Sequence, residues 1–294
     1  MTRQLVAVHG RAQQHKDAAD LKRSWIDAWS RGLAESDLSV PIDESAIRFP
    51  YYGDTLARLV DGGEVPDVIV KGPEPPSEAQ GFIAKVLEEA RQARGVTDEQ
   101  VLAEVEERAA IEKGPQNWRW VRAVARALDT HVPGASSATL AAVTYDVNCY
   151  LRNPGTRDVI EKGVRAAISS EVETVVVGHS LGTVVSYNLL RREGADNGWK
   201  VPLFVTLGSP LAVRAIRQAL QPIQHPSCAQ VWFNAMDERD IVALYPLKAP
   251  HFDIDPAIEN KTGVANHTSN RHGIAGYLDD PAVARRIHAA LTKS

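Results

Sequence analysis

The order of apolar runs and amphipathic stretches along the chain predicts strands that alternate with helices. Six short apolar runs, most of them rich in β-branched residues, have the composition of strands: 5–8, 46–50, 141–145, 173–177, 201–207 and 230–234. Stretches with helical character lie between them: 21–29, 159–168, 182–192 and 211–220. Repeated units of this kind predict a mostly parallel sheet that is covered by helices on both faces.

The middle of the chain departs from this alternation. Glycines and prolines cluster from 62 to 76, which is typical of a boundary between segments. Two helices are then expected to begin at capping boxes, in which a hydroxyl and a glutamine three residues later bond each other's backbone amides: Ser77 with Gln80, and Thr97 with Gln100. A third amphipathic stretch spans 118–124. We therefore expect one domain over residues 1–294, with a helical cap inserted at 72–135.

Composition and charge argue against nucleic-acid binding, a zinc site and a disulfide scaffold. The 294 residues are 44% hydrophobic and 24% charged, which is typical of a globular protein. The net charge is -4, with 33 basic and 37 acidic residues mixed along the chain, so no cationic field is available for a nucleic acid. Cys149 and Cys228 have neither the spacing of a zinc site nor the density of a disulfide scaffold.

The apolar runs are too short for membrane insertion. No segment approaches the roughly 18 apolar residues that a membrane-spanning helix needs. The apolar run at 5–8 is also too short for the core of a signal peptide. We therefore expect a cytoplasmic protein without a transmembrane segment, whose partner is a small molecule and not a nucleic acid.

The strongest chemical signal is a serine between two glycines, in Gly178-His-Ser-Leu-Gly182. It follows a run of valines and precedes a helical stretch, which is the context in which a G-x-S-x-G pattern forms a nucleophile elbow. Glycine is needed at both flanking positions because strand and helix approach each other closely around a sharp turn. The turn exposes the Ser180 hydroxyl and directs the amino end of the helix at the reacting group. An ordinary glycine-flanked turn is the alternative, and the strand and helix on either side favour the elbow.

The segment Val175-Val-Val-Gly-His-Ser-Leu-Gly182 resembles the nucleophile region of α/β-hydrolase lipases and esterases. The resemblance implies the α/β-hydrolase fold and an oxyanion hole made by two backbone amides. One amide belongs to the residue after the serine, here Leu181. The other belongs to a loop after an early strand that often begins His-Gly, and Val8-His-Gly-Arg11 is similar to that loop. The resemblance therefore assigns the second amide to Arg11.

The same family arranges its triad in the chain order serine, acid, histidine. Five histidines follow Ser180: His225, His251, His267, His272 and His288. His267 and His272 share a polar loop that leads into a helical stretch, where the family has its catalytic histidine. His272 lies immediately before that stretch and is the predicted base, with His267 as the alternative.

The acid that orients the base is expected in the loop after the strand at 230–234. Asp237, Glu238 and Asp240 are the carboxylates of that loop. Asp240-Ile-Val resembles the Asp-Ile-Val-Pro segment of fungal triacylglycerol lipases, with Ala243 in place of proline. The resemblance assigns the acid to Asp240, and Asp237 remains the alternative.

Together these residues predict a serine hydrolase that cleaves a carboxylic ester through an acyl-enzyme on Ser180. A thioesterase, an amidase or peptidase with the same triad, and a hydrolase-like module that binds a ligand without turnover are the alternatives. No metal or organic cofactor is expected, because the sequence has no H-E-x-x-H, no G-x-x-x-x-G-K-[ST] and no G-x-G-x-x-G after a strand.

The predicted cap at 72–135 occupies a place where this family commonly inserts structures over the carboxyl ends of its strands. We therefore expect the cap as a whole to influence which acyl chain is accepted. Trp118 and Trp120 either line an acyl pocket or pack the cap onto the core, and packing is the commoner use of paired aromatic residues at a helix start.

Overall fold

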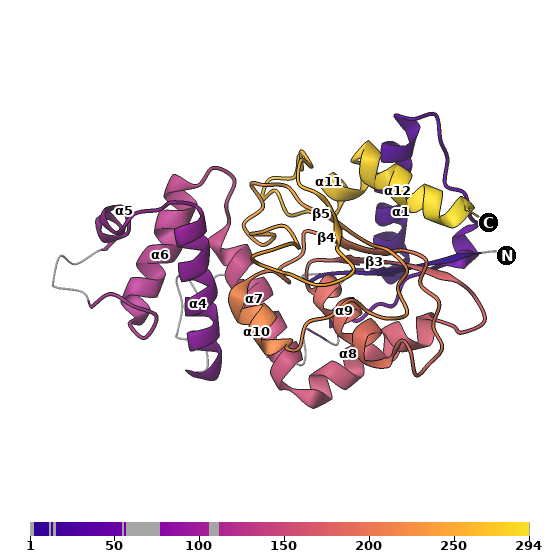
Figure 1. Cartoon of the computed structure of the whole chain (residues 1–294). Helices are drawn as coiled ribbons and strands as arrows, with labels where there is room; N and C mark the ends of the chain where they lie inside the picture. The colour runs from indigo at the N-terminus through magenta and orange to yellow at the C-terminus, as the bar shows by residue number, and fades with distance from the viewer. Residues whose placement is uncertain are drawn as a thin grey trace.

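The computed structural model describes residues 3–11, 13, 16–54, 56, 77–105 and 112–293, which form a sheet with helices on both faces (Figure 1). The sheet has six strands, all parallel, in the order β2-β1-β3-β4-β5-β6. Five of them overlap predicted runs: β1 (Gln4–Val8), β2 (Ile47–Arg48), β3 (Thr174–His179), β4 (Phe204–Leu207) and β5 (Trp232–Ala235). The predicted parallel sheet between helical layers is thereby confirmed.

Two elements differ from the prediction. The sequence does not predict β6 (Glu259–Lys261), an edge strand of three polar residues without an apolar signal. The prediction of a strand at 141–145 is wrong, because these residues lie inside helix α7 (Ser137–Arg152). Ser136 caps this helix by accepting the Thr139 amide at 3.1 Å. Most residues of α7 are buried. A helix that is buried on several sides has no polar face, so periodicity does not distinguish a short apolar run within it from a strand.

Alternate residues of the strands face two separate cores. Val6 and Val8 of β1 belong to the first core, whereas Leu5 and Ala7 belong to the second, because successive side chains of a strand point to opposite faces. The helices over the first core are α8 (Pro154–Ala167), α9 (Leu181–Glu193) and α10 (Arg214–Ala219). Those over the second are α1 (Ala18–Ala34), α11 (Ala275–Leu278) and α12 (Pro281–Thr292).

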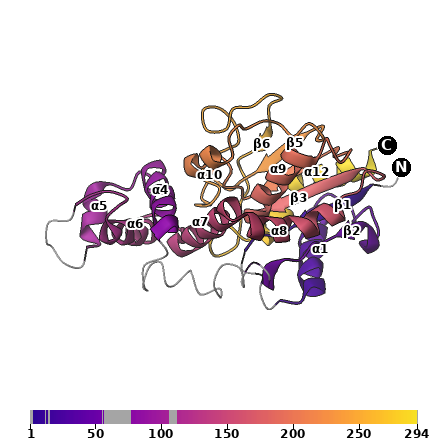
Figure 2. The same ribbon diagram turned by 90° about the horizontal axis from the view of Figure 1, so that it is seen from below.

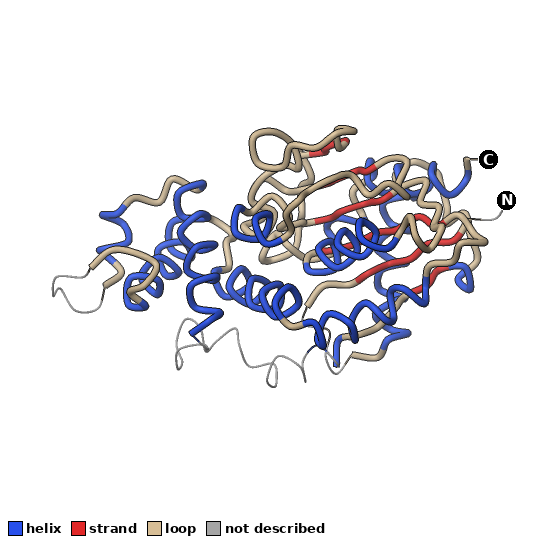
Figure 3. The backbone as a smooth tube through the Cα atoms, turned by 60° about the horizontal axis from the view of Figure 1, so that its bottom comes forward, coloured by secondary structure: helices blue, strands red, loops and turns tan. Residues whose placement is uncertain are grey.

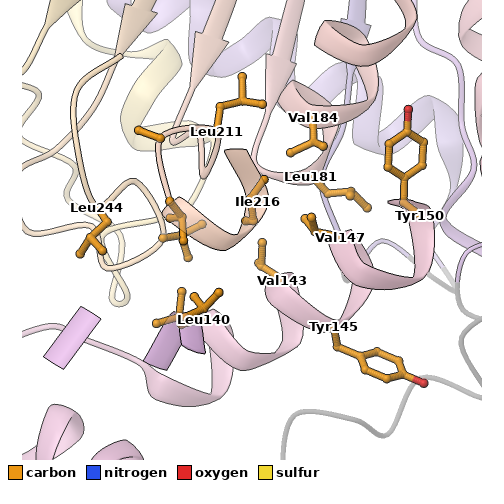
Figure 4. Close-up of a cluster of buried hydrophobic side chains, with 14 of the residues drawn as sticks. Leu140, Val143, Tyr145, Val147, Tyr150, Leu181, Val184, Leu211, Ile216 and Leu244 are labelled. Atoms are coloured by element: carbon orange, nitrogen blue, oxygen red, sulfur yellow. The ribbon is translucent and has the colours of Figure 1, made fainter. Parts of the chain in front are cut away.

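Three helices between β2 and β3 form a lobe that projects beside the sheet: α4 (Ser77–Ala93), α5 (Asp98–Ala103) and α6 (Trp118–His131) (Figures 1 and 2). The lobe and the first face of the sheet share one continuous apolar core. α7 connects them, and Figure 4 shows Val143 and Val147 of α7 directed at Leu181 of α9 and Ile216 of α10. A short 3₁₀ helix, Glu44–Ala46, precedes β2.

One of the two predicted capping boxes is confirmed. The Gln100 amide donates to Thr97 Oγ1 at 3.3 Å, and the Thr97 amide donates to the Gln100 side chain at 2.8 Å, so α5 begins where the sequence predicts. The side chain of Ser77 and the predicted boundary at 62–76 lie outside the described residues.

The chain reverses its direction across the sheet between β1 and β3. From β1 it crosses to β2 at one edge, then returns to β3 on the other side of β1 and continues outward to β6. Because parallel crossovers are right-handed, helices before and after the reversal cover opposite faces, as α1 and α9 do. Loops gather at the carboxyl ends of the strands, between the sheet and the lobe (Figure 3). In open α/β sheets, ligands bind in the crevice at such a reversal.

We expect Gly182→Ala to lower the free energy of unfolding by about 3 kcal/mol or to prevent folding, because overpacking a close backbone contact displaces the elements that form it. A Cβ atom at Gly182 would lie 2.2 Å from the Val8 carbonyl oxygen. Gly81, on the exposed side of α4, is the matched control, since its added Cβ meets nothing within 4 Å. Gly81→Ala should stabilise the protein by up to about 1 kcal/mol. Urea denaturation measures both, and equal effects would contradict the close packing of α9 on β1.

Candidate active site

Ser180 lies at the sharp turn between β3 and α9, at the point where the order of strands across the sheet reverses. Its backbone has φ 54° and ψ -125°, a conformation that costs a serine on the order of 1–3 kcal/mol. The close approach of helix and strands accompanies it: a Cβ atom at Gly178 would lie 2.8 Å from the Gly182 carbonyl oxygen, and one at Gly182 would lie 2.2 Å from that of Val8. The structure therefore contains the glycine-flanked turn that the sequence predicts.

Three predicted residues from distant parts of the chain meet at this turn. His272 Nε2 lies 2.8 Å from Ser180 Oγ, and His272 Nδ1 lies 2.7 Å from Asp240 Oδ2. A carboxylate only accepts hydrogen bonds, so Nδ1 carries the ring proton and Nε2 is free to accept the serine proton. The exposed fraction of each residue is 5% or less. Bulk water therefore does not compete for these bonds.

Asp240 is surrounded by hydrogen-bond donors. Tyr277 donates its hydroxyl proton to Asp240 Oδ2 at 2.6 Å, and the Val242 amide donates to Oδ1 at 2.8 Å. Complete burial by itself raises the pKa of the Asp240 carboxyl, but the His272 ring and these hydrogen bonds outweigh burial and keep the pKa below its ordinary value. At neutral pH, Asp240 is therefore the charged partner of the imidazole. No local sequence pattern identifies Tyr277.

The two alternative residues have other partners. Asp237 accepts the amides of Arg239 at 2.7 Å and Asn266 at 2.9 Å, and it thereby ties the loop after β5 to the loop that carries the predicted base. His267 is largely exposed and pairs with Asp279 at 3.1 Å. Neither alternative side chain takes part in the hydrogen bonds that reach the serine.

The two amides predicted for the oxyanion hole belong to the loops at the reversal point. Leu181 is the first residue of α9, and amides of the first helical turn have no partner within their own helix. Arg11 follows Gly10, and a Cβ atom at Gly10 would lie 2.9 Å from the Cβ atom of Ser180. The loop after β1 therefore runs directly against the serine. The oxyanion role of both amides stays a prediction.

The side chain of Arg11 forms a buried ion pair with α7. Its Nε lies 2.7 Å from Asp146 Oδ2, and the exposed fractions of the two side chains are 13% and 2%. Burial raises the pKa of the Asp146 carboxyl, and the charge of Arg11 opposes this rise. Asp146 Oδ1 has no hydrogen-bond partner within the described ranges. α7 thus holds the loop that carries one of the predicted oxyanion amides.

Two further histidines of the site stay neutral, and the sequence identifies them only as parts of motifs. His179 donates from Nε2 to the His272 carbonyl at 2.8 Å and so fixes the backbone of the predicted base. His9 accepts the Tyr52 amide at Nε2 at 3.1 Å and donates from Nδ1 to the Gly10 carbonyl at 2.7 Å. Burial lowers the pKa of His179 to about 3 and that of His9 to about 4. Neither ring therefore adds positive charge beside His272 at neutral pH.

The helical lobe contacts the loop of the predicted acid through Arg94, directly after α4. Arg94 Nη2 donates to the Asp240 carbonyl at 2.8 Å, and Nη1 donates to the Glu238 carbonyl. Burial lowers the pKa of Arg94, while the charges of Asp240 and Asp237 oppose that shift. Sequence reasoning missed Arg94, because its contact is made with a carbonyl 146 residues later in the chain.

A pocket of about 380 Å³ opens beside Ser180, and this volume lies in the range of small-molecule sites. Its apolar walls include Leu21 and Trp25 of α1, Val143 of α7 and Ile274 just before α11. Polar side chains of the loop after β1 and of the loop before α11 complete the lining. The pocket therefore lies at the reversal point of the sheet, between two of the loops that carry the predicted catalytic groups.

The lobe lies away from the lining of this pocket. No described residue of α4, α5 or α6 contributes to the lining. Trp118 and Trp120 are buried in the apolar core of the lobe, so both tryptophans pack, which is the commoner of their two expected uses. The contact between the described lobe and the predicted triad is made through Arg94, on the side of the acid.

Comparison with family models, with curated proteins and with solved structures finds no match to this chain. The inference of function therefore depends on the geometry of the site. Within the described ranges, His, Cys, Asp and Glu side chains form no group of three or more that could hold a metal ion. None of the described helices is both long enough and apolar enough to cross a membrane.

We expect Arg94→Met to loosen the loop of the predicted acid, because hydrogen bonds to charged groups contribute about 1.5–3 kcal/mol each. Hydrogen exchange of the Asp240 and Val242 amides should become about tenfold faster or more. Arg91→Met is the matched control: Arg91 lies in the last turn of α4, three residues before Arg94, and bonds Glu88 and the Val96 carbonyl. Equal exchange rates in the two variants would contradict the role of Arg94.

Proposed function

We propose that this chain is a serine hydrolase of the α/β-hydrolase type, with Ser180 as nucleophile, His272 as general base and Asp240 as the acid that orients the base. The observation that carries the proposal is the continuous line of hydrogen bonds from Asp240 through His272 to the hydroxyl of a strained serine. A nucleophile within reach of a base, which a third group orients in turn, is the arrangement that covalent catalysis requires.

Three features of the backbone support the fold assignment. The serine follows a central strand of a parallel sheet and immediately precedes a helix. The proposed triad follows the chain order serine, acid, histidine. The loop between β1 and α1 lies against the serine, where this fold takes its second oxyanion amide.

The proposed reaction proceeds through an acyl-enzyme. His272 Nε2 takes the proton of Ser180 as Oγ attacks the carbonyl carbon, and the amides of Leu181 and Arg11 stabilise the oxyanion, each by about 3–4 kcal/mol. His272 then gives the proton to the leaving group. Water, deprotonated by the same nitrogen, adds to the acyl carbonyl, and collapse of that intermediate frees the acid and restores Ser180. Asp240 stays ionised throughout and stabilises the imidazolium.

A carboxylic ester is the substrate class that we propose. Thioesters and amides require the same steps and differ in the leaving group, so the relative turnover of matched ester, thioester and amide substrates decides between them. Binding without turnover would need neither a serine in a strained conformation nor a base aligned on its hydroxyl, and the geometry therefore favours an enzyme over a binding module.

We expect a fluorophosphonate to label the wild-type protein at one serine. Ser180→Ala should abolish labelling and ester hydrolysis and leave the fold intact, because the elbow depends on its glycines and not on the hydroxyl. Ser186→Ala is the control: Ser186 lies on the same helix, is buried, and its hydroxyl has no hydrogen-bond partner in the described structure. Mass spectrometry of the labelled protein reads out both variants. Undiminished labelling of the Ser180→Ala variant would exclude Ser180 as the nucleophile.

We expect Asp240→Asn to lower activity and Asp237→Asn to lower stability. Asp240→Asn should lower kcat by about 10⁴, the loss seen when an amide holds the triad histidine in the wrong tautomer. Asp237→Asn should retain most of kcat and lower the free energy of unfolding by about 1–3 kcal/mol, since one of two amides that it accepts loses its partner. Steady-state kinetics and urea denaturation separate the two effects. A larger loss of kcat in Asp237→Asn would mean that the wrong acid has been assigned.

A further inference from the structure

The pocket beside Ser180 has an asymmetric charge lining. Two cationic side chains, Arg11 and Lys16, contribute to it, and no Asp or Glu side chain does so among the described residues. The charge of Arg11 is compensated by its ion pair with Asp146. Lys16 is exposed and forms no ion pair within the described part of the chain; its Nζ contacts the side-chain oxygen of Gln13 at 3.1 Å. The pocket therefore carries one uncompensated positive charge.

The nearest acidic residue along the chain forms no ion pair with Lys16 in the described structure, because its carboxylate is turned to the start of α1. Asp17 follows Lys16 directly, but its carboxylate caps α1 by accepting the Ala19 amide at 2.8 Å and the Asp20 amide at 3.0 Å. The field of Lys16 also reaches the interior of the site. Burial is the main cause of the lowered pKa of His9, and the charge of Lys16 adds to it. Lys16 and His9 both belong to the lining of this pocket.

A second donor belongs to the lining of the same pocket and comes from the loop before α11. Asn270 lines the pocket, and its side-chain oxygen accepts the His272 amide at 3.1 Å. No described residue accepts a hydrogen bond from its Nδ2 group, so these hydrogens are available to a ligand. Lys16, in the loop before α1, and Asn270, in the loop before α11, therefore both bring hydrogen-bond donors to the lining of a cavity of about 380 Å³, which has room for a short substrate group.

We propose that this pocket takes substrates that carry a negatively charged group near the scissile bond, with Lys16 as the residue that selects them. This inference rests on the proposed function. The apolar walls receive the carbon skeleton of the substrate, and the ammonium of Lys16 and the amide of Asn270 bind the anionic end. A purely apolar acyl chain would gain nothing from the positive charge.

Paired substrates that differ in charge test the inference on the wild-type chain. The first pair consists of 4-nitrophenyl esters with five-carbon acyl groups, glutarate monoester and valerate, so that the charge lies on the acyl side. The second pair consists of 4-acetoxybenzoate and its methyl ester, so that the charge lies on the leaving group. Each kcat/KM is divided by the second-order rate constant of hydroxide-catalysed hydrolysis, which corrects for the intrinsic reactivity of the ester and leaves out the intramolecular attack of the glutarate carboxylate. We expect the anionic member of at least one pair to be preferred.

Variants of Lys16 locate the origin of that preference. The ratio of anionic to neutral turnover should fall about tenfold in Lys16→Met and further in Lys16→Glu. Lys200→Glu is the matched control, because Lys200 is exposed and lies far from the site. Its carbonyl accepts the Thr174 amide where β3 begins, at the amino ends of the strands, whereas the site lies at their carboxyl ends. It changes the net charge equally and should keep the wild-type ratio. Raising the salt from about 0.05 to about 0.5 M should weaken the preference, because exposed charges are screened.

The outcomes separate this inference from the proposed function. Hydrolysis of the neutral esters without a preference for charge, or with a preference that the Lys16 variants retain, would overturn the selection by Lys16 and leave the serine hydrolase intact. Absence of hydrolysis for all four esters together with absence of fluorophosphonate labelling would overturn the proposed function, and this inference with it.

Discussion

The close packing of α9 against the carboxyl end of β1 is the constraint on which the rest of the site depends. At Gly182 the helix lies so near the Val8 and His9 carbonyls that a Cβ atom would stand 2.2 Å and 2.6 Å from their oxygens. The chain must therefore turn sharply, and the turn places Ser180 at positive φ. The next residue, Leu181, directs its side chain into the core between α7 and α9 (Figure 4). Burial of that side chain holds the strained serine in place, with its hydroxyl towards His272.

The polar groups around Ser180 favour one position for the ring proton of His272, which lies on Nδ1. Asp240 is kept ionised by Tyr277, the Val242 amide and the imidazole. The adjoining rings of His9 and His179 remain neutral because they are buried. In a site of low polarity each of these interactions is stronger than it would be in water. Among the described residues, the charged group that bonds the His272 imidazole is therefore Asp240, on the side of the ring away from the serine.

The helices between β2 and β3 support this arrangement at two points. Arg94, at the end of α4, bonds carbonyls of the loop that carries Asp240. Asp146, on α7, holds the side chain of Arg11 beside the serine. One contact lies on the acid side of the proposed triad and the other on the oxyanion side. The described helices of this region therefore hold two loops of the site, and they share one apolar core with the sheet.

Local patterns were sufficient for much of the fold and for the proposed nucleophile, and a family resemblance supplied the proposed acid and base. The elbow around Ser180 could be predicted because glycine spacing, a valine-rich strand and a helical stretch are all local, and five strands were predicted from short apolar runs. Asp240 and His272 could be named because the resemblance to α/β-hydrolase lipases implies a chain order and loop positions for the acid and the base. The run at 141–145 was misassigned because burial of α7 on several sides depends on neighbours that are distant in sequence. Arg94, Tyr277, His179 and the pair of Arg11 with Asp146 act across long separations, and the uncompensated charge of Lys16 is visible only once the lining of the pocket is known. Tertiary structure alone decided these contacts, because which polar groups meet in a buried site is set by the packing of the whole chain.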